Sequence, residues 1–366
     1  MWWRDRHSAI TFDAGAAGLR AVQFRRRGER TELCDALQFE LPGASADPPS
    51  AGLDLATIAR AVEQGRFVGR EVGLVLSPPD VQFLPVRVPP QVLTQPPERF
   101  HQAVQFEVSQ AARRGAEEVE LRAWPLPMAG HQQPNVIAVT LPAAQAAAWC
   151  AAAEQQRLTL RRIDVAPCAL VALAARTWPP EDGASWGVLD LGRRHTTLTL
   201  VVGRTPAYIR TLGACSHDWT QRLAAAFEVP LDVAEELKRR HGIRAPDRGV
   251  RSSGGDPGRL VGDELAGACA SVLRDALRAL SAEVGRCFAY LQQAFPEHSP
   301  GRLVLGGGGA GLPGLAELLQ AELEIPVCVL APEPSVSGAA AVPPDRRIDV
   351  RNAAAVGAAL LDLEAA

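Results

Sequence analysis

Lysine is almost absent from this 366-residue sequence, because Lys238 is the single lysine among 38 basic residues. A lysine ammonium is compact, whereas the arginine guanidinium is planar and rigid. Lys238 therefore either fills a role that arginine would not fill or stands there by chance. The formal net charge is −3. Without an excess of positive charge, nucleic acid is not expected to be a main partner.

Paired cysteines are also missing. The seven cysteines are scattered and form no Cys-x-x-Cys pair, and the histidines lack the spacing of metal ligands. This pattern indicates free thiols in a reducing compartment and argues against disulfides or a zinc site. No apolar run reaches the length of a membrane-spanning helix, and the first residues lack a signal-peptide pattern. We therefore expect a cytoplasmic protein.

Two strand–turn–strand patterns with an Asp-x-Gly turn stand out. Residues 10–24 contain Asp13-Ala-Gly15, and residues 186–201 contain Asp190-Leu-Gly192. Each pattern predicts a β-hairpin. Residues 303–311 predict a buried strand that leads into a cluster of glycines and then into a helix.

The chemistry of these three segments suits phosphate binding. A glycine at a turn lets backbone N–H groups approach phosphate oxygens. An aspartate beside it can hold the waters of a Mg²⁺ ion that bridges the phosphates, and Asp13 and Asp190 are the candidates. Either turn alone could be an ordinary hairpin turn. Both turns together with the glycine cluster favour a nucleotide site.

With these motifs the sequence resembles the PilM family, actin-like proteins of type IV pilus assembly that are related to FtsA. The resemblance also rests on Thr196-Thr197, Arg210–Gly213, Ala234–Arg239 and Leu312–Leu315. It implies an α/β fold with two actin-like ATPase lobes, each ribonuclease H-like, that bind ATP and Mg²⁺ between them. The residues that it assigns to the nucleotide are Asp13, Gly15, Arg20, Asp190, Gly192, Thr196, Thr197, Gly213, Glu235, Lys238, Gly306, Gly307, Gly308 and Gly309.

The resemblance also implies a division of the chain. The first lobe would comprise residues 1–182, with a small α/β subdomain inserted at about 81–141. The second lobe would comprise residues 183–345, with a mobile loop at about 244–260. Residues 346–366 would form a C-terminal helix that returns to the first lobe.

The implied function is that of a cytoplasmic adaptor at the inner membrane. In the family, the inserted subdomain and the first lobe form a groove for the N-terminal tail of the membrane protein PilN, among other pilus platform proteins. Residues 358–366 lack a basic amphipathic membrane helix, so membrane contact is expected to be indirect. A homo-oligomer is compatible with the sequence.

Several positions depart from the family pattern. Ala16 and Ala17 stand where hydroxyl residues are usual, Arg20 stands in place of a lysine, and Ala214 replaces a glycine. These changes leave nucleotide binding in place but make hydrolysis slow or absent. Asp164 is the candidate for orienting an attacking water, and a structural aspartate at a helix entry is the alternative.

Other readings stay open. The Glu235–Lys238 pair, one helical turn apart, contacts the ribose and base in the family but could be a surface ion pair of little weight. A nucleotide-free structural module such as GspL of type II secretion is an alternative function. A small-molecule kinase of the actin-like superfamily is a further one.

Overall fold

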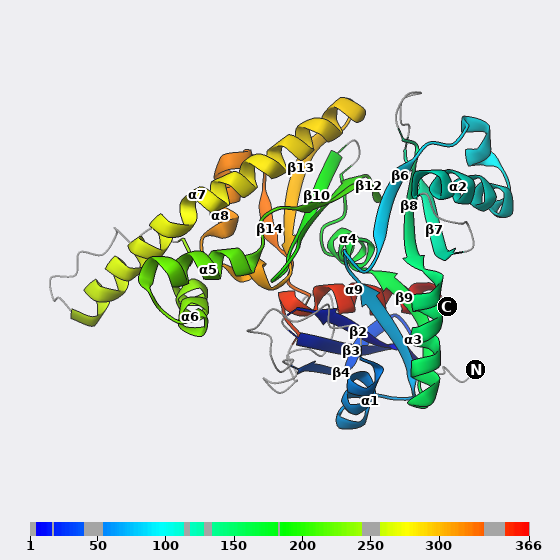
Figure 1. Ribbon diagram of the computed structural model, residues 1–366, viewed down its shortest axis with the longest axis horizontal. Coiled ribbons are helices and arrows are strands. Elements are labelled where there is room, and N and C mark those ends of the chain that lie inside the picture. The colour runs from blue at the N-terminus through cyan, green and yellow to red at the C-terminus, as the bar shows by residue number, and fades with distance from the viewer. Residues whose placement is uncertain are drawn as a thin grey trace.

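The computed structural model describes residues 5–16, 18–39, 54–112, 118–127, 134–181, 184–243, 257–332 and 348–365. Its strands form three sheets (Figure 1). Two larger sheets are separated by a pair of helices, and a smaller sheet stands beside them. Within the described residues, no helix is both long and apolar enough to cross a membrane.

The first large sheet has the order β1-β3-β2-β5-β9, and β4 also pairs with β3. Helices α1 (Leu55–Gln64) and α3 (Ala143–Gln155) cover one face, where they bury Phe12 and Leu74. Helix α1 begins at Asp54, whose carboxylate accepts the amides of Ala56 and Thr57, as an N-cap does. The strands are β1 (Arg6–His7), β2 (Ile10–Gly15), β3 (Gly18–Arg27), β4 (Arg30–Phe39), β5 (Glu71–Leu76) and β9 (Thr159–Val165).

The second large sheet has the order β12-β11-β10-β13-β14. Its first three strands form an antiparallel meander, and β10 pairs in parallel with β13. The strands are β10 (Ala184–Leu191), β11 (Thr196–Val202), β12 (Thr205–Leu212), β13 (Ser299–Gly306) and β14 (Val327–Val329). The helices that pack with it are α5 (Ser216–Phe227), α6 (Leu231–His241), α7 (Pro257–Ala294) and α8 (Leu315–Leu323).

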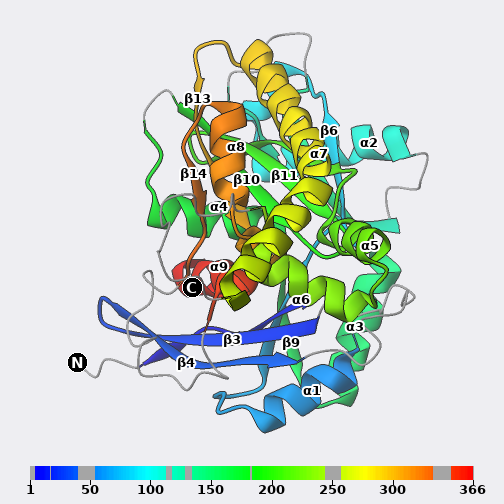
Figure 2. The same cartoon turned by 90° about the vertical axis from the view of Figure 1, so that its left-hand side faces the viewer.

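Helices α4 (Ala166–Thr177) and α9 (Ala353–Ala365) lie between the two large sheets (Figure 2). One continuous core joins both helices to Val22 and Phe24 of the first sheet and to Val188 of the second. The helices approach closely at Gly357, because a Cβ there would collide with the backbone carbonyl of Ala169. Small residues are needed where two helix backbones come this near.

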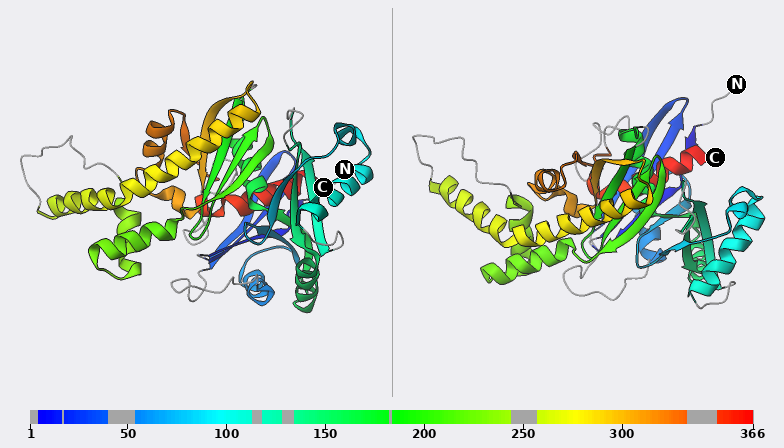
Figure 3. Two further views of the ribbon diagram at one scale, coloured as in Figure 1. Left: turned by 45° about the horizontal axis from the view of Figure 1, so that its top comes forward. Right: turned by 90° about the horizontal axis from the view of Figure 1, so that it is seen from above.

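A third unit is inserted between β5 and β9 of the first sheet. It is a three-stranded sheet in the order β6-β8-β7, with β6 (Gln82–Val86), β7 (Val119–Pro125) and β8 (Val136–Pro142). Helix α2 (Pro97–Ala112) and the 3-10 turn η1 (Pro90–Thr94) cover one face around a small apolar core. Figure 3 shows this unit at the opposite end of the molecule from α5 and α6.

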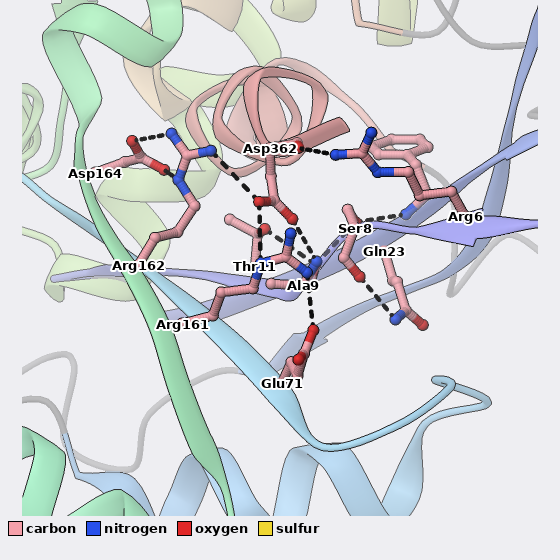
Figure 4. Close-up of polar contacts among 11 residues, drawn as sticks. Arg6, Ser8, Ala9, Thr11, Gln23, Glu71, Arg161, Arg162, Asp164 and Asp362 are labelled. Carbon is pink, nitrogen blue, oxygen red and sulfur yellow. Dashed lines mark hydrogen bonds and ion pairs between the residues drawn. The ribbon is translucent and has the colours of Figure 1, made fainter. Parts of the chain in front are cut away.

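A buried carboxylate fastens α9 to the first sheet (Figure 4). Asp362 is 4% exposed, and its Oδ2 accepts the backbone amide of Ala9 at 2.8 Å. Its Oδ1 lies 3.4 Å from Nε of Arg161 and 3.5 Å from Nη1 of Arg162. The last helix is therefore bound to both β9 and the entry of β2.

The sequence-based expectations differ from the structure at a few element ends. The spacing of residues 232–240 predicts a helix capped by Asp232, but α6 begins at Leu231 and its N-cap position is Pro230, so Asp232 lies in the first turn. Helix α7 begins at Pro257, so residues 257–260 are helical, while residues 244–256 of the expected mobile loop lie outside the described residues. The lobe boundaries at residues 182 and 345 stay predictions.

Candidate functional site

The two Asp-x-Gly segments form hairpins of the same construction. In the first, Asp13 on β2 pairs directly with Arg20 on β3. In the second, Asp190 on β10 pairs with Thr197 on β11. In both hairpins the partner follows the aspartate by seven positions. The two hairpins therefore present one aspartate each, beside a guanidinium in one case and a hydroxyl in the other.

The glycine cluster lies against the second hairpin. Gly306 ends β13 and pairs with Asp190. Gly307 has φ +75°, and a Cβ there would touch Oδ1 of Asp190. At Gly309 a Cβ would lie 3.0 Å from the Leu191 carbonyl oxygen. Only glycine permits both the backbone angle at 307 and the close approach to the aspartate.

The charge of Asp13 on the first hairpin acts on Asp190 of the second. Burial is the main cause that raises the pKa of Asp190 to about 7, and the negative charge of Asp13 raises it further. Burial also raises the pKa of Asp13, while Arg20 opposes that shift. The Arg20 charge lowers the pKa of Asp190 as well. The two sheets thus bring Asp13, Arg20 and Asp190 into one electrostatic cluster.

Two buried donors of this region lack a partner. Among the described residues, four buried side-chain polar atoms make no hydrogen bond, and two of them are Nε of Arg20 and Oγ1 of Thr196. Buried polar groups are normally paired. Unpaired donors beside glycine turns suit an anion with several oxygens. The residues present therefore fit the phosphates of a nucleotide.

Helix α5 continues the site behind the second hairpin. The amide of Gly192 donates to the His195 carbonyl at 3.0 Å and closes the turn. The amide of Ser216, the first residue of α5, donates to the Gly192 carbonyl at 3.1 Å. Sequence reasoning missed this use of Ser216, although its place at a helix start was a usable signal.

Lys238 and Glu235 form the expected pair on α6, and Nζ lies 2.7 Å from Oε2. The ammonium also donates to the carbonyl and hydroxyl oxygens of Ser216, at 2.9 and 2.8 Å, and to Oγ1 of Thr220 at 2.8 Å. Lys238 is only 4% exposed. Its contacts fasten α6 to the start of α5, and a contact with ribose and base stays a prediction.

The remaining predicted glycines differ in their surroundings. Gly213 is exposed between β12 and α5, with nothing near its Cβ position. Gly308 is also exposed, with Arg351 as its nearest neighbour. Gly15 borders Arg20, because a Cβ at Gly15 would lie 3.1 Å from Nη1. Ala17 lies outside the described residues.

Asp164 shares a row with Asp13 across the first sheet, because both pair with Val75. Its carboxylate is held by Arg162, with N–O distances of 2.6 and 2.7 Å. Burial raises the pKa of Asp164, and the Arg162 charge opposes the shift. The residue does not cap α4, whose N-cap position is Val165. A water-orienting role stays a prediction.

Comparisons with known proteins agree with this architecture. The family model of the cell division protein FtsA matches residues 187–357, somewhat less than half of the chain. Among solved structures, the PilM-PilN type IV pilus biogenesis complex matches with a TM-score of 0.75 and 24% identity, over 97% of this chain and 98% of that chain. No match was found among curated protein sequences.

More distant structures share the same fold. MreB 5 of Spiroplasma citri, solved with AMPPNP, matches with a TM-score of 0.53 and 10% identity, over 98% of this chain and 97% of that chain. The ethanolamine utilization protein EutJ from Carboxydothermus hydrogenoformans matches with a TM-score of 0.52 and 14% identity, over 97% of this chain and 90% of that chain. The expected two-lobed actin-like fold is therefore confirmed, and so is the expected resemblance of this chain to PilM.

Proposed function

We propose that this chain is an actin-like adaptor of type IV pilus biogenesis that binds ATP with Mg²⁺ and docks the N-terminal tail of a PilN-like inner-membrane protein. The observation that carries the proposal is the match to PilM over almost the whole of both chains. With 97% of this chain matched, the inserted sheet of 61 residues (82–142) must lie largely within the match. By the family resemblance, we propose that the tail docks at this subdomain and the first lobe.

The nucleotide part of the proposal is supported by the cluster between the two hairpins. Mg²⁺, when bound, would neutralise phosphate charge through waters held by Asp13 and Asp190. The glycine at position 307 lets the backbone of the glycine cluster approach Oδ1 of Asp190 closely. The Arg20 and Thr196 donors supply further hydrogen bonds. The alanine at position 16 offers no hydroxyl, so any hydrolysis is expected to be slow.

The fold connects nucleotide binding with docking of the tail. The hairpins come from different sheets, so a nucleotide that contacts both favours one angle between the lobes. The inserted sheet would carry that change to a bound tail, which needs a coupling of only about 1–3 kcal/mol. The protein would then act at the cytoplasmic face of the membrane through its partner.

Calorimetry of Mg-ATP binding tests the nucleotide site, with Asp190→Ala as the site variant and Glu236→Gln, an exposed position on α6, as the control. Binding that is lost only in Asp190→Ala supports the site. Docking is tested separately by titrating a synthetic tail peptide of the PilN-like protein from the same organism, with and without ATP. No binding of the peptide under either condition would refute the adaptor function, and equal affinity would refute the coupling.

A further inference from the structure

We infer that Arg20 supplies from the protein itself much of the positive charge that a divalent metal would bring to the phosphates, so that this chain binds nucleoside polyphosphates with little dependence on Mg²⁺. The inference rests on the proposed nucleotide site and concerns how that site recognises its ligand. It starts from the position of the guanidinium, its burial and its missing partner.

The position of Arg20 is fixed by the first hairpin. Its strand pairing places it directly opposite Asp13, and its Nη1 lies 3.6 Å from Oδ2 of that carboxylate. The same nitrogen borders the turn, 3.1 Å from where a Cβ of Gly15 would lie. The guanidinium therefore lies over the Asp-x-Gly turn, where the backbone would meet a phosphate.

The guanidinium is poorly compensated for a buried charge. Arg20 is 7% exposed, yet among the residues that the structure describes Nε has no partner and the one ion pair is the long one to Asp13. A buried cation is stable when hydrogen bonds and an opposite charge compensate for its lost hydration. A planar guanidinium matches the geometry of two phosphate oxygens. The unpaired Nε together with its neighbouring nitrogens leaves donors for such a group.

The second hairpin has no arginine at the position equivalent to Arg20. Thr197 occupies the position equivalent to Arg20, so the same register carries a neutral hydroxyl there. The turn of the second hairpin carries Arg193 and Arg194, but at this register position the charge is found in the first hairpin. From it Arg20 acts electrostatically on both Asp13 and Asp190, the two groups expected to hold a metal through water.

A fixed cation at this point changes the balance between metal and protein. It attracts phosphate oxygens and repels a divalent cation from Asp13. In the described part of the chain, no three His, Cys, Asp or Glu side chains gather as a metal cage would require. A magnesium ion would therefore depend mostly on phosphate and water oxygens, while Arg20 contacts the phosphates without it.

The experiment measures ATP and ADP binding by calorimetry to the full chain in Mg²⁺ and in excess EDTA. For the natural chain we expect Kd to change by less than about threefold between the two conditions. Arg20→Gln should bind more weakly by about tenfold or more in EDTA and recover much of the loss in Mg²⁺. Arg25→Gln, on the same strand but in a partly exposed pair with Glu32, is the matched control and should behave as the natural chain.

Arg20→Lys keeps the charge and should still bind nucleotide in EDTA. This variant also replaces Arg20→Gln in the test if circular dichroism shows that Arg20→Gln does not fold. A loss of about tenfold or more in the natural chain on removal of Mg²⁺ would overturn the inference and leave the nucleotide site intact. No nucleotide binding under either condition would overturn the proposed site as well. Equal binding by Arg20→Gln in EDTA would exclude Arg20 as the source of the charge.

Discussion

The indole Nε1 of Trp124 donates a hydrogen bond to the carbonyl oxygen of Pro206, and the two atoms are 2.8 Å apart. Trp124 lies on β7 of the inserted sheet, whereas Pro206 lies on β12 at the edge of the second large sheet. Leu126, just beyond β7, packs on the core of that second sheet. The chain enters the inserted unit after β5 and returns to β9, both strands of the first sheet, so this contact connects the unit to the second sheet as well.

Trp124→Phe keeps the ring but removes the donor. We expect a loss of about 1 kcal/mol of stability, because the partner is partly buried, and faster amide hydrogen exchange in β7. The control is Trp186→Phe, which removes a similar 2.8 Å bond from Nε1 to the Gly203 carbonyl inside the second sheet. Trp186→Phe should leave amide hydrogen exchange in β7 unchanged. Unchanged exchange in Trp124→Phe itself would show that the bond does not hold the inserted sheet.

Lys238→Met should destabilise the protein by about 2–4 kcal/mol, because it leaves the oxygens of Ser216, Thr220 and Glu235 without their shared donor. Lys238→Arg should also be destabilising, since a planar guanidinium cannot reproduce the cluster. Arg239→Met removes the exposed partner of Glu235 and should change the unfolding free energy by less than about 1 kcal/mol. Urea unfolding measures all three. Equal stability of Lys238→Arg and the natural chain would contradict the structural role.

The contribution of Asp190 to the stability of the ligand-free protein should fall as pH rises from about 4 to about 7. Folding raises the pKa of Asp190 from an ordinary value of 3.8 to about 7, so the folded state holds a proton that the unfolded state releases in this window. The resulting loss of folding free energy is absent below the pKa that Asp190 has in the unfolded chain. It is complete above the pKa of the folded state, where it reaches up to about 4 kcal/mol.

Asp190→Asn removes this loss of folding free energy. Compared with the natural chain, the variant should gain stability as the pH increases and differ little near pH 4, by urea unfolding across the range. Glu236→Gln on the exposed side of α6 should follow the natural chain. Parallel curves for Asp190→Asn and the natural chain would show that this carboxyl is not titrating between the two states.

Two helical glycines should respond in opposite directions to alanine. Gly357→Ala would press a methyl group onto the Ala169 carbonyl and should cost about 1–3 kcal/mol through overpacking between α4 and α9. At Gly285 in α7 a Cβ meets only Leu323 Cδ2, at 3.5 Å. Gly285→Ala should stabilise by up to about 1 kcal/mol, since alanine is the better helix former. Thermal unfolding distinguishes the pair, and a stable Gly357→Ala would contradict the close packing.

The local parts of this structure follow from local sequence. The Asp-x-Gly turns fix the register of both hairpins, and the pairing of Asp13 with Arg20 follows once the turn is tight. The N-cap at Asp54 and the strand Glu71–Leu76 are predictable for the same reason, because their signals lie within a few residues.

Long-range contacts could not be predicted in this way. Asp362 sits in an alanine-rich segment, and nothing near it in sequence indicates that it binds the amide of Ala9. The bond from Trp124 to Pro206 depends on how two sheets meet. Lys238 was singled out by its rarity, but its contacts with Ser216 depend on the packing of α6 against α5.

The core shared by α4, α9 and both large sheets means that the chain cannot be divided into two autonomous halves. A fragment of residues 184–332 alone would expose Val188, Val201 and Val304, which are buried against these helices. A fragment that ends before α9 would in turn uncover α4 and β3. Fragments made separately are therefore expected to aggregate. Two coexpressed fragments should reassemble only if one of them includes α9.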